Sequence, residues 1–187
     1  MKKILQILLF SLLWVGIAFA QAPDRRCAEV DRQYQEALQK MKGADEHQKM
    51  TVIFDNEDVN LGLVEKKLVF YYDNTQEEVN SNRLYLVRVE RRIPQSSVQE
   101  TIDYLFDPAY PLGRFILMNK DFSSSDYRIE ERAYSDGKKP FLMRSRQIEL
   151  PTGKVVNDAT QTKDIGDLDV KKHKVLLKIF NGIANPE

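Results

Sequence analysis

Cysteine and histidine are scarce in this chain of 187 residues, which contains one Cys and two His. A single cysteine cannot form an intramolecular disulfide, so the fold must depend on its hydrophobic core. The sequence has no Cys-x-x-Cys or His-x-x-x-His pair, which argues against a transition-metal site. Cys27 is expected to be buried and inert or to form an intermolecular bond, and His47 and His173 are expected to be solvated.

Clustered glycines and a surplus of one charge are also missing. The eight glycines are scattered singly, so no phosphate-binding loop is indicated. The 28 basic residues equal the 28 acidic residues in number, which argues against nucleic acid as a partner. No Gly-x-Ser-x-Gly motif is present, and the acidic segments 55–58 and 164–169 lack the spacing of an EF-hand. We therefore predict no cofactor and no metal.

Long apolar runs are absent except at the N-terminus. There, Lys2 and Lys3 precede the nearly apolar segment 4–19, which ends in the small-x-small pattern Ala18-Phe19-Ala20. The sequence predicts a signal peptide at 1–20 that is cleaved after Ala20, and a single α+β domain at 21–187. Cys27 does not follow a small apolar tripeptide, so we expect an exported protein, periplasmic or extracellular, that is not a lipoprotein and has no membrane span after cleavage.

Two segments have the periodicity of amphipathic helices. In 24–42, apolar residues recur at steps of three and four and form one stripe, and Gly43 is a plausible stop. The members of this stripe are Cys27, Ala28, Val30, Tyr34, Ala37, Leu38 and Met41. A second helix is predicted at 167–181, with Gly182 as its stop and with its lysines and His173 on the solvated side.

Between these helices the period changes to two. Alternating runs predict strands at 67–72, 83–93, 101–107 and 127–134, a short apolar run predicts one at 50–54, and 141–150 is the last strand candidate. Segment 115–118 is apolar on both faces, as in a central strand. Three sets of residues are each assigned to one apolar face: Leu68, Phe70 and Tyr72; Tyr85, Val87, Val89 and Ile93; and Ile102, Tyr104 and Phe106, with Asp103 and Asp107 outward. Segment 152–166 is expected to be irregular.

The connections between these strands are short and rich in turn residues, including the hairpin signal Asp136-Gly137. Such connections exclude parallel crossovers and favour an antiparallel meander of about six or seven strands. An antiparallel sheet with an apolar face needs a cover, which the two helices can supply. The predicted fold class is α+β: a curved sheet around a helix, packed with an N-terminal and a C-terminal amphipathic helix.

The segments LVFYYD (68–73) and TIDYLFD (101–107) are rich in aromatic residues and end on Asp before a turn. With the signal and a short helix before a long meander, the chain resembles a broad group of exported single-domain proteins of Gram-negative gut bacteria. The likeness covers about 49–150. It implies a periplasmic or extracellular setting and brings no established activity.

Charged residues alternate along three of the predicted strands, and they are the candidate site. We expect a ligand or partner face formed by Arg88, Glu90, Arg92, Arg128, Arg132 and Arg144, with Glu130 and Arg146 beside them. One interpretation is cross-strand ion pairing on a solvated face. The other is recognition of an anionic or glycan ligand, because arginine offers planar bidentate donors.

Three functions are compatible with these observations. The first is an exported, non-enzymatic binding or interaction module whose partner is an envelope protein, a glycan or a small anionic ligand. The second is a hydrolase on an envelope or dietary polymer, with a carboxylate pair that the sequence does not identify. The third is a structural or assembly protein of the envelope, held through the N-terminal helix or an edge strand.

Overall fold

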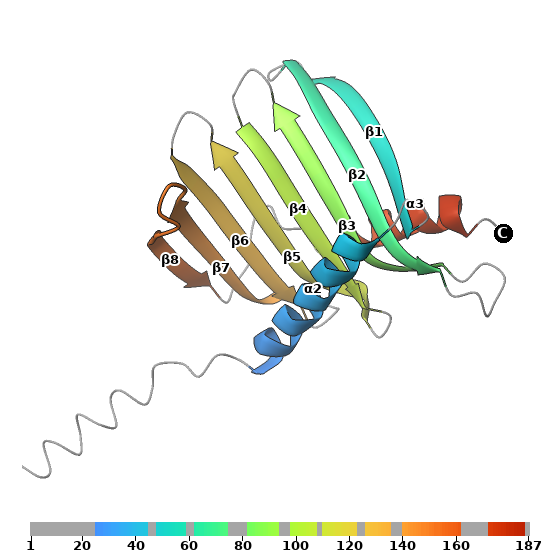
Figure 1. Cartoon of the computed structure of the whole chain (residues 1–187), viewed down its shortest axis with the longest axis horizontal. Helices are drawn as coiled ribbons and strands as arrows, with labels where there is room; N and C mark the ends of the chain where they lie inside the picture. The colour runs from blue at the N-terminus through green and yellow to red at the C-terminus, as the bar shows by residue number, and fades with distance from the viewer. Residues whose placement is uncertain are drawn as a thin grey trace, which may run out of the picture.

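The computed structural model describes residues 25–44, 48–58, 62–74, 82–93, 98–107, 110–122, 126–135, 140–161 and 172–185. The expected signal peptide, His47, segment 164–169 and the Asp136-Gly137 turn lie outside these residues. Within them, two helices pack on one eight-stranded antiparallel sheet (Figure 1). The predicted α+β class is confirmed.

The strands lie in the sheet in the order in which they occur in the chain, so the sheet is a simple meander. The elements are α2 (Arg25–Gly43), β1 (Lys49–Asp58), β2 (Gly62–Asn74), β3 (Asn82–Ile93), β4 (Val98–Asp107), β5 (Tyr110–Phe122), β6 (Tyr127–Ser135), β7 (Pro140–Glu149), β8 (Val155–Gln161) and α3 (Lys172–Ala184).

The count of six or seven strands was wrong, because β8 occupies part of the segment expected to be irregular. Residues 155–160 of β8 are all exposed. A strand with no buried face has no alternation of apolar and polar residues, and this alternation is the signal by which the other strands were found.

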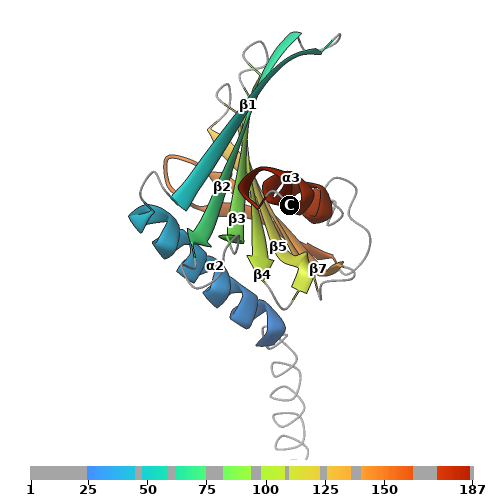
Figure 2. The ribbon, with the colours of Figure 1, turned by 90° about the vertical axis from the view of Figure 1, so that its right-hand side faces the viewer.

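The two helices lie on opposite sides of the sheet, as the edge-on view in Figure 2 shows. On one face, Leu176 and Phe180 of α3 pack against a core that includes Phe70, Val87 and Ile116. On the other face, α2 packs against residues of β3 to β6. The sheet therefore separates two apolar cores, where we had expected it to curve around one helix.

The central strand was predicted correctly, and so was the buried stripe of α2 except at Ala28, which is exposed. Residues 115–118 of β5 are all buried, two of them facing each helix. Cys27 is 8% exposed and lies on the buried side of α2. Neither described helix is long and apolar enough to span a membrane.

Tyr85 lies on the opposite face from the one that strict alternation assigned to it. Tyr71 pairs with Leu86 and Tyr72 pairs with Leu84, so Tyr85 is an extra residue in β3. Such a bulge interrupts the alternation. Tyr85 therefore joins the core beneath α2, while Leu84 joins the core beneath α3.

His173 was wrongly assigned to the solvated side of the last helix. Its side chain is completely buried, and its ring centroid lies 5.1 Å from that of Tyr104 and 5.0 Å from that of Phe106. Together with Leu176 and Phe180 it forms the buried face of α3. Gly182 lies inside this helix and does not end it.

Replacing Phe180 by alanine should lower the free energy of unfolding by about 3–5 kcal/mol, because the change leaves a cavity in the core. The Phe180 ring is completely buried, with its centroid 6.1 Å from that of Phe70 and 5.4 Å from that of Tyr72. Ile183→Ala on the same helix is the control, since Ile183 is 54% exposed. Urea denaturation measures both, and equal losses would contradict the assigned packing of α3.

Candidate functional site

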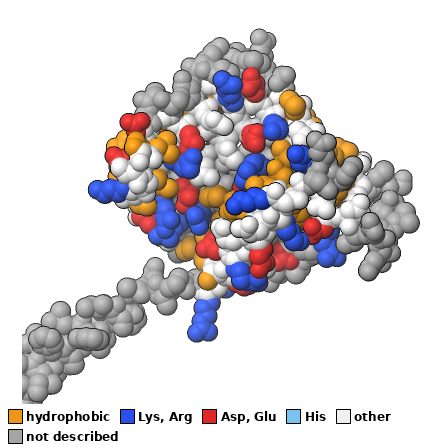
Figure 3. All heavy atoms as spheres, in the orientation of Figure 1, with side chains coloured by type: hydrophobic (Ala, Val, Ile, Leu, Met, Phe, Trp, Pro, Cys, Tyr) orange, Lys and Arg blue, Asp and Glu red, His pale blue; other side chains and the backbone are white. Residues whose placement is uncertain are grey.

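The helix α2 covers only part of the sheet face on which it lies, which we call the α2 face (Figure 1). The strand register places all six predicted residues on this face. Arg88, Arg132 and Arg144 belong to one row of directly opposed positions, Glu90 to the next row, and Arg92 and Arg128 to the third. Figure 3 shows basic and acidic side chains interspersed across this face.

The first contact between α2 and this face is built around a buried carboxylate. Asp103 was predicted to point outward, but it is only 2% exposed because α2 covers it. Arg88 donates two hydrogen bonds of 2.7 Å to its two carboxylate oxygens, and the Tyr34 hydroxyl of α2 donates another of 2.6 Å. Burial and the neighbouring Asp103 carboxylate raise the pKa of Tyr34 well above its ordinary value.

The second contact has the same chemistry with the roles of helix and sheet exchanged. Tyr134 of β6 donates a hydrogen bond of 2.9 Å to Asp31 of α2, and an Arg132 nitrogen lies 3.6 Å from the same carboxylate. Burial and this hydrogen bond raise the pKa of Tyr134. The helix and the sheet thus each supply one tyrosine and one aspartate, and each aspartate has an arginine beside it.

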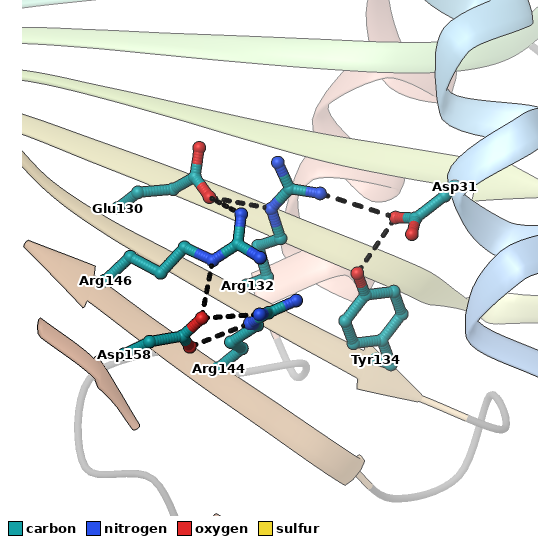
Figure 4. Close-up of polar contacts among 7 residues, drawn as sticks. All are labelled: Asp31, Glu130, Arg132, Tyr134, Arg144, Arg146 and Asp158. Atoms are coloured by element: carbon teal, nitrogen blue, oxygen red, sulfur yellow. Dashed lines mark hydrogen bonds and ion pairs between the residues drawn. The ribbon is translucent and has the colours of Figure 1, made fainter. Parts of the chain in front are cut away.

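From this second contact a chain of ion pairs extends toward β8, as Figure 4 shows. Arg132 donates to Glu130 at 2.9 Å, and an Arg146 nitrogen lies 3.8 Å from the same carboxylate. Arg146 also lies 3.3 Å from Asp158 of β8, which accepts two hydrogen bonds from Arg144 at 2.8 and 2.5 Å. Three guanidinium groups and three carboxylates alternate along this chain.

Asp158 explains how two arginines can occupy facing positions. Arg132 and Arg144 are directly opposed on β6 and β7, and like charges in such positions destabilise a sheet. The bidentate contact of Arg144 with Asp158 compensates that repulsion. The hydrogen bond from Arg144 lowers the pKa of Asp158.

The remaining candidate residues are also paired with opposite charges. Arg128 donates hydrogen bonds of 2.6 and 2.8 Å to Asp121. The Lys67 ammonium lies 3.3 Å from Glu90, while the more exposed Arg92 lies 4.0 Å from Glu65. Ion pairing therefore accounts for the contacts of all six predicted residues. It is cross-strand for five of them, whereas Arg132 pairs with Glu130 of its own strand and with Asp31 of α2.

Sequence reasoning missed the partners that organise this face, namely Asp31, Tyr34, Asp103, Tyr134 and Asp158. Asp31 and Tyr34 were assigned to a helix whose docking face on the sheet was unknown. Asp158 fell in the segment expected to be irregular. The alternation did carry one usable signal, because it placed Arg88 and Asp103 each on the polar side of its strand. The β3–β4 register then sets the two residues directly opposite each other.

A recess of about 290 Å³ opens on the part of the α2 face that lies over β1 to β4. The α2-face side chains that line it are Ile53, Glu65, Lys67, Glu90, Arg92 and Gln99. Two of the six predicted residues, Glu90 and Arg92, are among them. On this face the lining provides two cations, two carboxylates, an amide and an exposed apolar side chain. The lining also includes Lys66 and Arg91, whose strand positions belong to the opposite face of the sheet.

No family model, curated protein or solved structure matches this chain. The resemblance to exported proteins of gut bacteria therefore stays a prediction. Within the described part of the chain, no three His, Cys, Asp or Glu side chains converge in a way that could hold a metal ion.

Replacing Arg88 by methionine should lower the free energy of unfolding by about 3 kcal/mol or more, because it leaves the buried Asp103 charge without its cation. Arg92→Met is the control and should cost about 1 kcal/mol or less, since the Arg92 side chain is 68% exposed. Adding Asp103→Asn to Arg88→Met should recover part of the loss. Denaturant unfolding of the three variants measures these differences, and equal costs for the two single changes would contradict the assigned role of Asp103.

Stability should also fall at alkaline pH. The folded-state pKa values of Tyr34 and Tyr134 lie above their ordinary value of 10.0, and burial raises that of Tyr85 to about 12. Above pH 10 these tyrosines lose their protons in the unfolded chain before they do so in the folded protein. Their contribution to the free energy of unfolding is therefore complete below pH 10 and is lost as the pH rises through their folded-state pKa values. Melting temperature against pH measures the decline. The decline should be shallower in Tyr34→Phe, and an unchanged profile in that variant would contradict the assignment.

Proposed function

We propose that this protein is an exported, non-enzymatic binding module that holds its ligand in the recess on the uncovered part of the α2 face. The recess itself is the observation that carries the proposal. It lies beyond the area occupied by α2, and it contains residues from the alternating charged pattern of β3. Binding sites are typically concave and carry a few polar groups that fix the orientation of the ligand.

The charges of the recess favour an uncharged polar ligand. Lys67 contacts Glu90, and Arg92 faces Glu65, so each of the two cations on the α2 face has a carboxylate beside it. A small anion would have to compete with these carboxylates for the donors. The hydroxyl groups of a neutral glycan can instead donate hydrogen bonds to the carboxylates and accept hydrogen bonds from the cations, while its C–H groups pack against Ile53. Of the partner classes considered, a glycan therefore suits the recess better than a small anion.

The hydrolase alternative has less support from the contacts on this face. A general acid needs a carboxyl group whose pKa is raised toward the working pH. The pKa of Asp158 is instead lowered by its hydrogen bond from Arg144. Four further carboxylates, Glu65, Glu90, Asp103 and Asp121, are each already engaged in an ion pair with a neighbouring cation.

A structural or assembly role is the second candidate function. It is favoured by the two ends of the sheet, because within the described residues the outer edges of β1 and β8 pair with no further strand. Open edges are potential sites of strand addition by another chain.

A glycan array that displays neutral, acidic and sulfated oligosaccharides tests the binding proposal. We expect the protein to retain neutral glycans. Glu90→Ala and Arg92→Ala should each weaken binding about tenfold or more, which corresponds to about 1.4 kcal/mol. Arg128→Ala is the matched control, because Arg128 has the same pairing chemistry but lies outside the recess. Binding only to acidic glycans, or binding that neither recess variant weakens, would overturn the assignment.

A further inference from the structure

The outer edge of β1 is the least protected edge of the sheet. Its ten residues pair with β2 without any shift in register. The strand contains no proline, and the segment 50–54 carries no charged residue. Proteins usually guard such edges with charges, prolines or bulges, because an unpaired backbone edge accepts strands from other chains.

Large apolar side chains are exposed on both faces of this strand. Ile53 is 66% exposed on the α2 face, and Phe54 is 39% exposed on the opposite face. In Figure 2 the strand forms the near edge of the sheet, with α2 and α3 to either side of it. Neither helix covers the outer backbone edge of β1 in this view.

The opposite edge of the sheet, formed by β8, has both a register shift and a central charged residue, which β1 lacks at its centre. The register of β7 and β8 shifts between Gln147 and Ile148, and a bulge of this kind twists an edge away from pairing. Asp158 lies in the middle of β8 and is held by Arg144 and Arg146. Two copies of β8 paired through their centres would bring two such carboxylates close together.

We propose that β1 binds β1 of a second copy of this chain, antiparallel and with Ile53 opposite Ile53 of the second copy. Directly opposed residues of an antiparallel pair point to the same face. In this register each α2-face residue of one β1 lies opposite an α2-face residue of the other β1, along the whole strand. Val52 then lies opposite Phe54, which covers the exposed apolar side chains on one face, while the two Ile53 side chains meet on the other.

The distribution of charge along β1 specifies the antiparallel orientation. The strand begins with Lys49 and ends in acidic residues, among them Glu57. In the proposed register position 49 lies opposite position 57, so the register sets a basic position of the sequence against an acidic one at both ends of the interface. A parallel arrangement would instead place like charges side by side, which is unfavourable.

This dimer would join the two sheets into one and place both recesses on the same continuous face. Ile53 lines the recess and also lies at the two-fold axis, so each copy would contribute to the wall between the two sites. The dimer does not depend on what the recess binds, and the two proposals can therefore fail separately.

Sedimentation equilibrium of the purified protein over a wide concentration range tests the dimer. We expect a reversible monomer–dimer equilibrium whose dimer is lost in Ile53→Lys, because two lysines would then face each other at the axis. Val156→Lys on β8 is the matched control, since Val156 is also exposed, and it should dimerise as the parent does. A thermal melt of each variant verifies that it is folded.

The register has its own test in the charges at the ends of β1. Lys49→Glu should weaken dimerisation, and combining it with Glu57→Lys should restore it. In addition, Ile53→Cys should give a disulfide-linked dimer under oxidising conditions, because directly opposed strand positions have a suitable separation, whereas Val156→Cys should not.

A parent protein that stays monomeric at every concentration would overturn the proposal, as would a dimer that Ile53→Lys leaves intact. A dimer that depends on Val156 and not on Ile53 would assign the interface to β8 instead. Co-purification of a different protein on β1 in place of the second copy would also overturn it. Loss of the dimer with glycan binding retained in Lys49→Glu, a position outside the recess, would separate this interface from the function of the recess.

Discussion

The structure depends on how α2 is fixed to a sheet face that is partly charged. Asp103 is buried beneath the helix, and burying a carboxylate is costly unless it is paired and hydrogen-bonded. Arg88 and Tyr34 together supply its ion pair and hydrogen bonds. Asp31, Tyr134 and Arg132 repeat the arrangement nearer the N-terminus of the helix. These contacts are directional, so they specify where α2 lies on the sheet in a way that apolar packing alone does not.

The position of α2 divides this face into a closed part and an open part. Beneath the helix the face is mostly apolar, with Phe115 and Leu117 in the core around the buried Asp103. Beyond it, ion pairs extend over β2 to β8 and keep cations and carboxylates in nearly equal number. Each exposed pair stabilises the fold only slightly. Their main consequence is a sheet face that can remain in contact with water and that contains the recess over β1 to β4.

Period-two alternation was sufficient to predict most of the sheet. It assigned Leu68, Phe70 and Tyr72 to one face, and it identified the alternating charged residues of each candidate strand, while the register of the structure was needed to show that these strands share one charged face. This works because one-residue steps along a strand alternate between faces. The predictions failed where another constraint overrode that period: the bulge at Tyr85, and the fully exposed strand β8.

The errors at His173 and Asp103 have a different origin. Both are polar residues that the fold buries, His173 between two aromatic rings and Asp103 beneath a helix. Sequence patterns assign polar residues to solvent unless a partner is known, and the partners here lie far away along the chain. The recess was missed for the same reason, because its walls come from four strands.

Hydrogen exchange measured by mass spectrometry shows whether the tyrosine–aspartate contacts fix α2 to the sheet. If α2 is an integral layer of the fold, its amides should be protected as strongly as those of β5 and should exchange only through global unfolding. Tyr34→Phe should then reduce the protection of both elements together. Rapid exchange in α2 beside a fully protected sheet would contradict the role assigned to these contacts. It would show that the helix opens independently and that the tyrosine–aspartate contacts do not hold it in place.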